Sequence, residues 1–314
     1  MTPHAADVLT LGETMAAFKF GGPVRLGGTA TVSVAGAEST VAVGLARLGH
    51  HAAWVGVTGA DETGALVRRT LRAEGVDLTW ARVEAARPTG LILFESRLPG
   101  VDRVTYHRAG SAGATLTAVE VAAAVEAAAP RIVHVTGITC ALGAGPAEAV
   151  RTAARLGRAA GATVCLDVNH RRRLWSDDEA AATLRLLVSD VDVLVASDDE
   201  LHLVAGDDAV AGLLAAGVRE VVVKHGADGA TSHTADGSLH RPARHVAAVD
   251  TVGAGDAFVA GLLSGMLDGL DAGGRLDRAV TTGAFAVATR GDWEGLPTRD
   301  ELALLDHAPG TALR

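Results

Sequence analysis

The spacing of apolar residues along the chain predicts an alternation of strands and helices. Short apolar runs that suit buried strands begin near residues 8, 53, 132, 163, 191 and 221, and segments with helical periodicity lie at 37–48, 61–74, 145–160, 177–189 and 207–216. From residue 132 onward the strands recur about every 30 residues, the size of a strand–helix–strand unit. This alternation indicates an α/β fold, with a mostly parallel sheet covered by helices on both faces.

Two segments do not follow this rhythm. Residues 14–34 and 88–108 contain strand-like pieces without helical periodicity, and the second has a turn around Pro99 and Gly100. We expect them to form a small antiparallel sheet that protrudes as a lid from a single domain of residues 1–314. Three capping boxes mark helix starts: Thr117 with Glu120, Ser176 with Glu179, and Thr298 with Glu301.

Composition and charge exclude several classes of partner. The formal net charge is -9 and aromatic residues make up 3% of the chain, so neither a nucleic-acid surface nor an anionic membrane is a suitable partner. The N-terminus lacks the pattern of a signal peptide, and no apolar run approaches the length of a membrane span. Cys140 and Cys165 lie in apolar settings, as reduced buried thiols do. We therefore expect a cytoplasmic protein.

The stretch Asp250–Phe258 carries the strongest chemical signal. Gly253 and Gly255 precede a carboxylate, Asp256, and an apolar helical pattern follows. A glycine turn at a helix N-terminus presents backbone N–H groups to an anion. A carboxylate there would repel phosphate, but it could accept the proton of a hydroxyl that attacks a phosphoryl group. A short G-x-G-D alone is equally compatible with a capped turn.

The whole nonapeptide resembles the C-terminal signature of the ribokinase/PfkB family of sugar kinases. The resemblance implies a three-layer α/β/α fold, ATP as phosphoryl donor, and Mg²⁺ bridging its phosphates. It assigns Asp256 as the general base, and the N–H groups of Gly253, Ala254 and Gly255 as stabilisers of the moving charge. It also implies a homodimer through the lid and, in many members, a monovalent cation such as K⁺ beside the Asp250 turn.

A second signature lies near the N-terminus. Read alone, Ala35–Gly49 is a helix with a glycine entry, but with Val57–Gly64 behind it the segment resembles the family's sugar-binding signature. By that resemblance Gly36 touches the sugar, and Thr40 stands where the family usually has an asparagine that binds sugar hydroxyls. This departure leaves the exact sugar open.

Tyr106 and Arg108 alternate on a predicted strand and point the same way. They are compatible with a solvated strand face, or with a pair that holds a carboxylate and a hydroxyl. With Asp167-Val-Asn169-His-Arg171 after a buried strand, they resemble 2-keto-3-deoxygluconate kinases, whose substrate carries a carboxylate. That resemblance makes Tyr106, Arg108, Asn169 and Arg171 substrate contacts.

The nucleotide side is assigned by resemblance alone. Glu200 matches a family position that organises Mg²⁺ through water, and Ser197 replaces the usual asparagine beside the nucleotide; an acidic helix N-terminus is the alternative interpretation. Lys224, Gly226 and Gly229 resemble the strand and turn beneath ATP. The predicted function is an ATP-dependent kinase of a sugar acid, foremost 2-keto-3-deoxygluconate. A kinase of a neutral ketose or pentose, and a nucleotide-binding protein without phosphotransfer, remain as alternatives.

Overall fold

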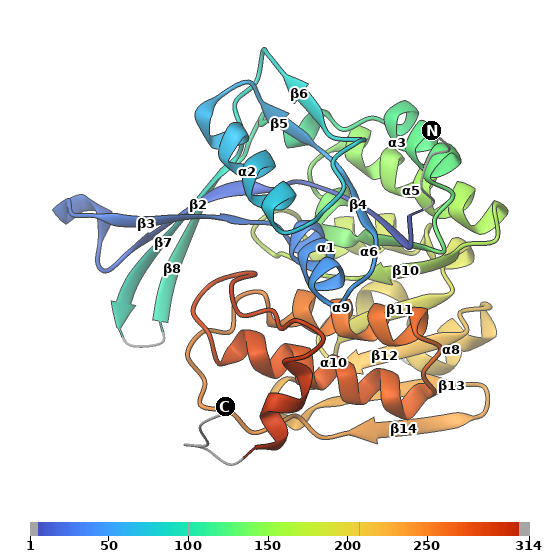
Figure 1. The fold of residues 1–314 in the computed structure, drawn as a ribbon. Helices are drawn as coiled ribbons and strands as arrows, with labels where there is room; N and C mark the ends of the chain where they lie inside the picture. Colours follow the sequence, from blue (N-terminus) through green and yellow to red (C-terminus); the bar gives the residue numbers. More distant parts are fainter. Residues whose placement is uncertain (1–5, 99–100, 207, 308–314) are drawn as a thin grey trace.

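An eight-stranded sheet forms the centre of the molecule (Figure 1). The computed structural model describes residues 6–98, 101–206 and 208–307. The strand order is β14-β13-β12-β11-β10-β9-β1-β4, parallel from β4 to β12 and closed by an antiparallel hairpin, β13–β14. The strands are β1 (Val8–Leu11), β4 (Ala52–Val55), β9 (Ile132–Thr136), β10 (Thr163–Asp167), β11 (Val193–Ser197), β12 (Glu220–Lys224), β13 (Ala230–Thr234) and β14 (Gly237–Arg241).

Helices cover both faces of this sheet, so the predicted α/β class is confirmed. One face packs against α1 (Ala37–Arg47), α2 (Glu62–Ala73), α9 (Ala254–Leu267) and α10 (Ala272–Val287). The other face packs against α3 (Ala118–Ala128), α4 (Gly137–Cys140), α5 (Ala144–Ala159), α6 (Asp177–Leu184), α7 (Leu201–Val204) and α8 (Ala209–Ala215).

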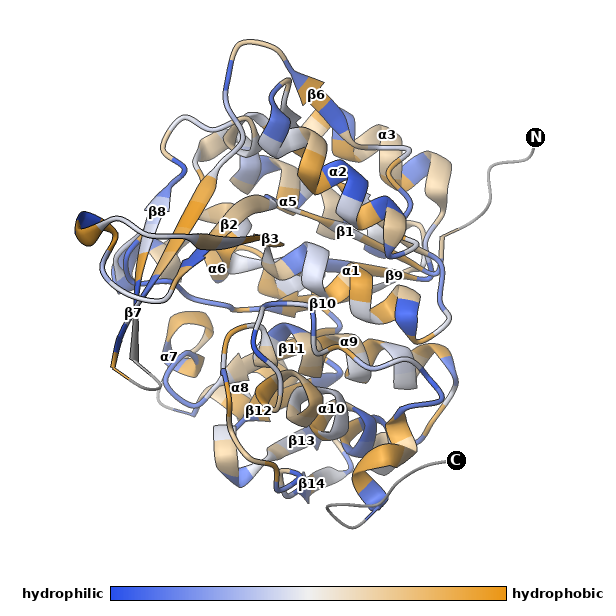
Figure 2. Cartoon of the chain, turned by 60° about the vertical axis from the view of Figure 1, so that its left-hand side comes forward, coloured by the Kyte–Doolittle hydropathy of each residue, from blue (hydrophilic) through white to orange (hydrophobic). Residues whose placement is uncertain are grey.

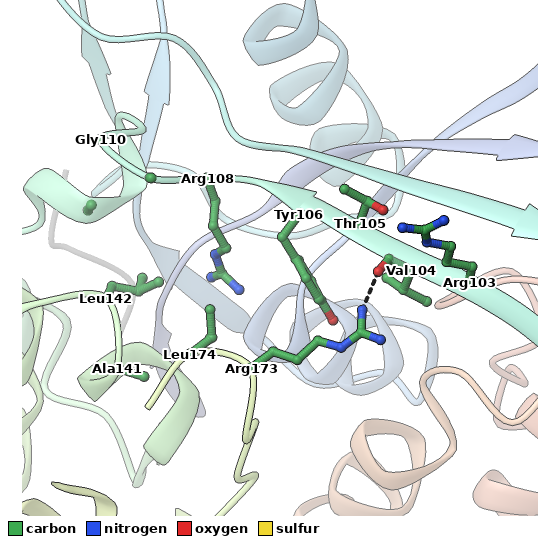
Figure 3. A pocket seen from close by; sticks show the side chains of 12 residues that line it. Arg103, Val104, Thr105, Tyr106, Arg108, Gly110, Ala141, Leu142, Arg173 and Leu174 are labelled. Carbon is green, nitrogen blue, oxygen red and sulfur yellow. Dashed lines mark hydrogen bonds between the residues drawn. The ribbon is translucent and has the colours of Figure 1, made fainter. Parts of the chain in front are cut away.

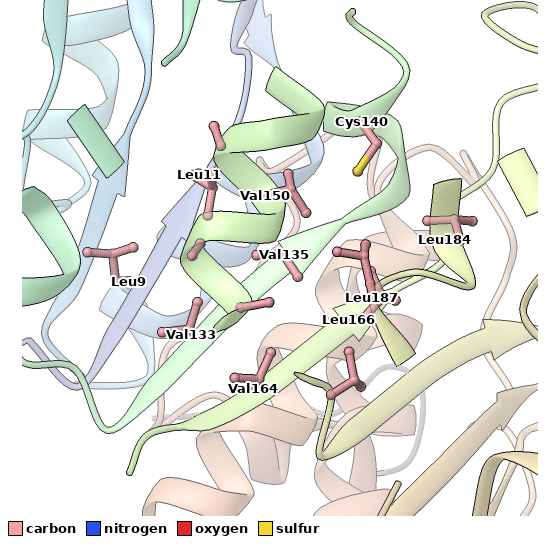
Figure 4. Close-up of a cluster of buried hydrophobic side chains, with 14 of the residues drawn as sticks. Leu9, Leu11, Val133, Val135, Cys140, Val150, Val164, Leu166, Leu184 and Leu187 are labelled. Carbon is pink, nitrogen blue, oxygen red and sulfur yellow. The ribbon is translucent and has the colours of Figure 1, made fainter. Parts of the chain in front are cut away.

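Alternation along the strands supplies both hydrophobic cores. Val133 and Val135 of β9 face the core beneath α5, while Ile132 faces the opposite core (Figure 4). Successive side chains of a strand point to opposite faces, so a strand buried on both sides must be apolar throughout. Figure 2 shows hydrophobic colours on the central strands and hydrophilic colours mainly on the outer helices and loops.

A second sheet projects from one side of the body (Figure 1) and is called the lid below. Its order is β3-β2-β7-β8, made of β2 (Met15–Phe20), β3 (Ala30–Ala35), β7 (Leu91–Leu98) and β8 (Val101–His107). The pairs β2–β3 and β7–β8 are antiparallel, but β2 and β7 are parallel. The predicted antiparallel lid is present as two antiparallel hairpins, but these hairpins pair with each other in parallel, because β2 and β7 both leave the body in the same direction.

Two capping boxes were predicted correctly, at Thr117 and Ser176. Thr298 also donates from its N–H and its hydroxyl to Glu301, but no α-helix follows, only a 3₁₀ turn, η5 (Leu302–Asp306). This turn buries none of its side chains, and a helix in water needs such packing to propagate. The predicted helix at this position is wrong.

The remaining short elements complete the chain. They are β5 (Val57–Gly59), β6 (Arg82–Glu84), and the 3₁₀ turns η1 (Val24–Leu26), η2 (Gly113–Thr115), η3 (Val188–Asp190) and η4 (Gly226–Asp228). Across the parts of the chain that the structure describes, no helix has the length and apolar character needed to cross a membrane.

Candidate active site

A cavity of about 370 Å³ lies between the lid and the carboxyl ends of the parallel strands. Ligands of open α/β sheets bind at this edge. Most of the predicted site residues line it, and these are Gly36, Tyr106, Arg108, Asn169, Arg171, Ser197, Glu200, Lys224, Gly253, Gly255 and Asp256. The cavity therefore joins residues from the lid, from the strand ends and from the start of α9.

Asp256 lies in the first turn of α9, which begins after Gly253. Gly253 has a φ of 74°, in the left-handed region that favours glycine, and this reversal directs the chain into the helix. The N–H of Ala254 donates to the carbonyl of Thr251 at 3.4 Å, and Ala254 does not line the cavity. Gly253 and Gly255 are thus the glycine-turn residues that face the site.

The Asp256 carboxyl group is buried, with an exposed fraction of 7%. Burial raises its pKa to about 8, and the nearby charge of Asp292 adds to this effect, while Arg171 and Lys224 oppose it. No Lys, Arg or His nitrogen of the described chain lies within 4.0 Å of the Asp256 carboxylate. A carboxyl group with a pKa near neutral pH, facing a cavity, is suited to proton transfer.

Asn169 holds this carboxyl group from the side. Its Nδ2 donates to Asp256 Oδ1 at 3.0 Å, and its backbone has a φ of 39°, unusual for a residue other than glycine. The N–H of Asn169 donates to Asp167 Oδ1 at 3.2 Å, which stabilises that conformation. Asn169 is therefore a neighbour of the base as well as a lining residue of the cavity.

Lys224 is paired with Asp167 at the end of β12. Its Nζ lies 3.0 Å from both carboxylate oxygens, and a Cβ added at Gly255 would lie 3.6 Å from the same nitrogen. Burial disfavours the ammonium charge, but Asp167 and Glu200 outweigh this and raise the pKa of Lys224. A fixed positive charge therefore lies beside the glycine turn.

Glu200 joins the loops that follow β10 and β11. Its Oε1 accepts the N–H of His170 at 2.7 Å, and its Oε2 accepts the N–H of Ser197 at 2.8 Å. Among the residues that the structure describes, no three His, Cys, Asp or Glu side chains are arranged to hold a metal ion. Mg²⁺ in kinases is held largely by phosphates and water with one or two carboxylates, so Glu200 fits an ion that arrives with ATP.

A buried ion pair lines the cavity beside the lid. Arg108 Nε donates to Glu13 Oε2 at 2.7 Å, and its second terminal nitrogen, Nη2, lies 2.6 Å from the same oxygen. The Ser111 hydroxyl donates to the other oxygen, Glu13 Oε1. Arg108 Nη1 is buried and has no hydrogen-bond partner within the described chain. Sequence reasoning missed Glu13, although it follows the first strand and so falls at the ligand-binding edge.

Tyr106 and Arg108 face the same way, as predicted. The guanidinium carbon of Arg108 lies 5.7 Å from the centre of the Tyr106 ring. Both residues also line a neighbouring cavity of about 540 Å³, which Arg173 enters from the other side while donating to the carbonyl of Val104 (Figure 3). Positive charge and a phenol hydroxyl therefore gather at the lid end.

Two more carboxylates line the cavity without having been predicted. Glu38, in the first turn of α1, accepts the hydroxyls of Thr136 and Thr139; burial raises its pKa despite these hydrogen bonds. Asp292 follows α10 and accepts the N–H of Gly36 at 2.9 Å through Oδ2. Glu38 stands within the N-terminal signature, but no pattern in the sequence singles out Asp292.

Some predicted positions lie apart from the cavity. Thr40 is buried and does not line it, and neither do Gly226 and Gly229 in the turn between β12 and β13. Asp250 accepts the N–H groups of Val252 and Gly291, and Lys19 of the lid lies 3.8 Å from its Oδ2. The monovalent cation beside Asp250 stays a prediction.

Comparisons with known proteins agree with the family resemblance. The sequence profile of the "pfkB family carbohydrate kinase" matches residues 5–299. The chain is 37% identical over 308 residues to 2-dehydro-3-deoxygluconokinase of Bacillus subtilis, covering 95% of this chain and 94% of that protein. It is 35% identical over 280 residues to fructokinase of Klebsiella pneumoniae, covering 85% and 90%.

The comparison with solved structures points to the same kind of protein. A putative ribokinase II from E. coli, in complex with ATP and Mg²⁺, superposes with a TM-score of 0.87 at 26% identity and covers 96% of this chain and 99% of its own. Sequence and architecture therefore agree over nearly the whole length.

Proposed function

The chain belongs to the pfkB family of carbohydrate kinases, and we propose that it phosphorylates the terminal hydroxyl of 2-keto-3-deoxygluconate with ATP. Family membership makes it a phosphotransferase with an alcohol acceptor. The finer assignment agrees with the Bacillus subtilis relative, since 2-dehydro-3-deoxygluconate is the same sugar acid under another name. One observation carries it: a single cavity is lined both by an unmatched buried carboxyl group, Asp256, and by the guanidinium of Arg108.

Asp256 accepts the proton of the attacking hydroxyl. The hydroxyl oxygen forms a bond to the γ-phosphorus as the bond to the departing ADP oxygen breaks, and its proton passes to Asp256. Asn169 orients the carboxyl group through its 3.0 Å hydrogen bond. The N–H groups at Gly253 and Gly255 stabilise negative charge on the transferred group, and the ammonium of Lys224 adds positive charge beside them.

Bound Mg²⁺ would neutralise charge on the ATP phosphates, with Glu200 the carboxylate of this chain that fits its water shell. The lid residues Ile92, Phe94 and Val104 form an apolar wall of the cavity. Such a wall excludes water from the transfer site and so limits wasteful hydrolysis of ATP.

At the lid end, the free Nη1 of Arg108 and the hydroxyl of Tyr106 bind the carboxylate of the sugar acid, together with Arg171. Glu13 and Ser111 hold the Arg108 guanidinium fixed before substrate arrives. A pre-oriented arginine loses little entropy on binding, which favours it for carboxylate recognition.

The test is coupled ADP release with Mg-ATP and a panel of 2-keto-3-deoxygluconate, 2-keto-3-deoxygalactonate, fructose, ribose and a nucleoside. We expect the keto-deoxy acids to have the highest kcat/KM. Arg171→Ala and Tyr106→Phe should raise their KM by about 10- to 100-fold, the effect of losing a hydrogen bond to a charged group. Arg172→Ala is the matched control, because Arg172 is exposed and does not line the cavity.

A neutral sugar as the preferred substrate, with KM unaffected by Arg171→Ala, would overturn the sugar-acid assignment and leave the kinase assignment intact. ATP turnover that is independent of every sugar would overturn the transfer reaction. Arg108→Ala is unsuitable as the first variant, because it leaves the Glu13 carboxylate buried without its partner.

A homodimer through the lid is proposed on the exposed apolar side chains there, which are Val24, Leu26, Val32 and Leu98. Sedimentation should give twice the chain mass of 31.8 kDa.

We also propose a cytoplasmic location, where ATP is available and the free thiols Cys140 and Cys165 stay reduced. Fluorescent tagging in intact cells tests that location.

We propose activation by K⁺ as well. It is tested by replacing K⁺ with tetramethylammonium in the coupled ADP-release assay.

A further inference from the structure

The neighbouring cavity of about 540 Å³, called the outer cavity below, has no part in the proposed transfer reaction. It lies between the lid strand β8 and two segments of the body, the loop after α4 and the loop after β10 (Figure 3). Cavities of this volume bind whole small molecules. Tyr106 and Arg108 line both cavities, so a ligand of the outer cavity would contact residues that the proposed function assigns to the sugar acid.

The charge of the outer cavity is unusual for this protein. Three arginines line it, and no Asp or Glu among the described residues does. Arg173 has no carboxylate oxygen within 4.0 Å in the described part of the chain. Arg103 Nε lies 3.9 Å from Glu95 on a side chain that is 71% exposed, which makes a weak ion pair. In a chain of net charge -9, this local excess of positive charge favours an anion.

Arg108 supplies a second, independent observation. Its exposed fraction is 7%, and Glu13 holds its Nε and Nη2, while its Nη1 has no hydrogen-bond partner among the described residues. A buried N–H donor without an acceptor costs free energy. Figure 3 shows the Arg108 side chain reaching from the end of β8 toward Leu142 and Leu174 across the cavity. An anion bound there would supply the acceptor.

Arg173 is held in place at the same cavity. Its Nη1 donates to the carbonyl of Val104 on β8, the edge strand of the lid (Figure 3). Within the described chain this is the one hydrogen bond of the Arg173 side chain, and a guanidinium has five N–H donors. The remaining donors are therefore available to a ligand, and the contact with β8 orients the group in advance.

The lining also narrows the class of anion. Arginine forks match phosphate oxygens, and three guanidinium groups suit the double charge of a phosphate better than the single charge of a carboxylate. Ala114, Ala141, Leu142 and Leu174 supply an apolar part of the lining, which suits a short carbon skeleton. Tyr106 is the one aromatic ring in the described lining, which gives little stacking surface to a nucleotide base. A small phosphate monoester fits these features together.

We propose that the outer cavity is a second anion site, which binds a small phosphate monoester between Arg103, Arg108 and Arg173. The bound phosphate lowers the affinity of the transfer cavity for the sugar acid, because Arg108 then faces two anions that repel each other. This second part rests on the proposed function, since it requires a substrate whose carboxylate binds at Arg108. The anion site itself does not depend on the sugar.

Isothermal titration calorimetry with glycerol 3-phosphate tests the site, with a non-hydrolysable ATP analogue present to occupy the glycine turn. We expect one molecule to bind per wild-type chain, and Arg103→Ala/Arg173→Ala to weaken its binding by about 10- to 100-fold. Inorganic phosphate should bind more weakly, because it makes no apolar contact, and glycerol should not bind. Arg97→Ala/Arg172→Ala is the matched control, because both side chains are exposed and line neither cavity.

Coupled ADP release gives a second readout. Glycerol 3-phosphate should raise the KM for 2-keto-3-deoxygluconate by about fivefold and then reach a plateau, because the two ligands bind together. Competition for a single site has no plateau. Arg103→Ala keeps the hydrogen bond between Arg173 and Val104, so its KM without the probe should equal that of the wild type, and a higher probe concentration should be needed for the same effect.

Equal affinity for glycerol 3-phosphate in the two double variants would overturn the anion site. A KM that rises without a plateau would overturn the coupling through Arg108. The calorimetry contains no sugar, so a failure of the sugar-acid assignment in the substrate panel leaves its result unaffected. Failure of the proposed substrate and failure of the outer site are therefore distinguishable.

Discussion

Two buried carboxylates line the cavity, Glu13 beside the lid and Asp256 at the start of α9, and their surroundings differ. Glu13, at the lid end, receives two nitrogens of Arg108 and the hydroxyl of Ser111. Asp256, at the transfer end, receives one amide from Asn169 and has the negative charge of Asp292 nearby. Both lie out of water, with exposed fractions of 3% and 7%.

This difference separates a structural charge from a reactive one. The Glu13 carboxylate, which receives two nitrogens of Arg108, fixes the position of that guanidinium. A buried carboxylate without a cation binds a proton readily, as the pKa of about 8 for Asp256 indicates. The carboxylate beside the lid therefore belongs to substrate recognition, and the carboxyl group of Asp256 transfers a proton. Removing either group, or its neighbours, should expose the difference.

The largest effect should come from Asp256→Asn. The variant keeps the shape of the side chain but cannot accept the proton, so kcat should fall by at least about 100-fold. It should also unfold at a higher temperature than the wild type at pH 8, because an amide avoids the cost of an unmatched buried charge. Coupled ADP release and thermal unfolding measure the two. Turnover like that of the wild type would disprove the assignment of the base.

Substitutions in the Glu13–Arg108 pair should show their largest effect in the free energy of unfolding rather than in kcat. Arg108→Met leaves the Glu13 carboxylate buried alone and should lower the free energy of unfolding by about 3–5 kcal/mol. The double variant Glu13→Gln/Arg108→Met should recover a large part of this, since no charge is then unmatched. Urea unfolding gives the values, with Arg103→Met as a control because that side chain is 71% exposed. Equal losses in the single and double variants would contradict the ion-pair explanation.

Gly253 and Gly255, the two glycines of the turn that begins α9, offer a third test. Alanine at Gly253 would face the Asp292 carbonyl at 2.0 Å and adopt a φ of 74°, whereas alanine at Gly255 would meet only Lys224 Nζ at 3.6 Å. We expect Gly253→Ala to lower the free energy of unfolding by about 1–3 kcal/mol and Gly255→Ala to change it by less than about 0.5 kcal/mol. Similar unfolding curves for the two variants would show that the Gly253 turn is not strained against Asp292.

The sequence was sufficient to predict most of the fold and the part of the site around Asp256. Local periodicity predicts the parallel strands, and Asp250–Phe258 is one contiguous segment, so Gly253, Gly255 and Asp256 are predicted together. The pairing of β2 with β7 is not encoded locally, because it joins residues about 75 positions apart. Lid strands with similar patterns fit either direction of pairing.

The same limit explains the carboxylates that were missed. Asp292 reaches Gly36 across 256 positions, and Glu13 reaches Arg108 across 95. Neither contact leaves a periodic or spacing signal in one sequence. The pairing of Lys224 with Asp167 is of the same kind, and it holds in place a charge that the family resemblance puts beneath ATP.

The comparison of Glu13 with Asp256 extends to a buried basic group, His134. Among the residues that the structure describes, the ring of His134 on β9 hydrogen-bonds the Thr10 hydroxyl alone, at 2.8 Å. Burial lowers its pKa to about 3, helped by the charge of Lys224. The unfolded chain takes up a proton below a pH of about 6.5 while the folded chain does not, so stability falls as pH decreases through that window. At pH 5 the loss should be about 2 kcal/mol, and His134→Gln should not show it. Urea unfolding of both proteins at pH 5 and pH 8 measures this. Parallel pH dependence in the two would mean that His134 is protonated within the fold.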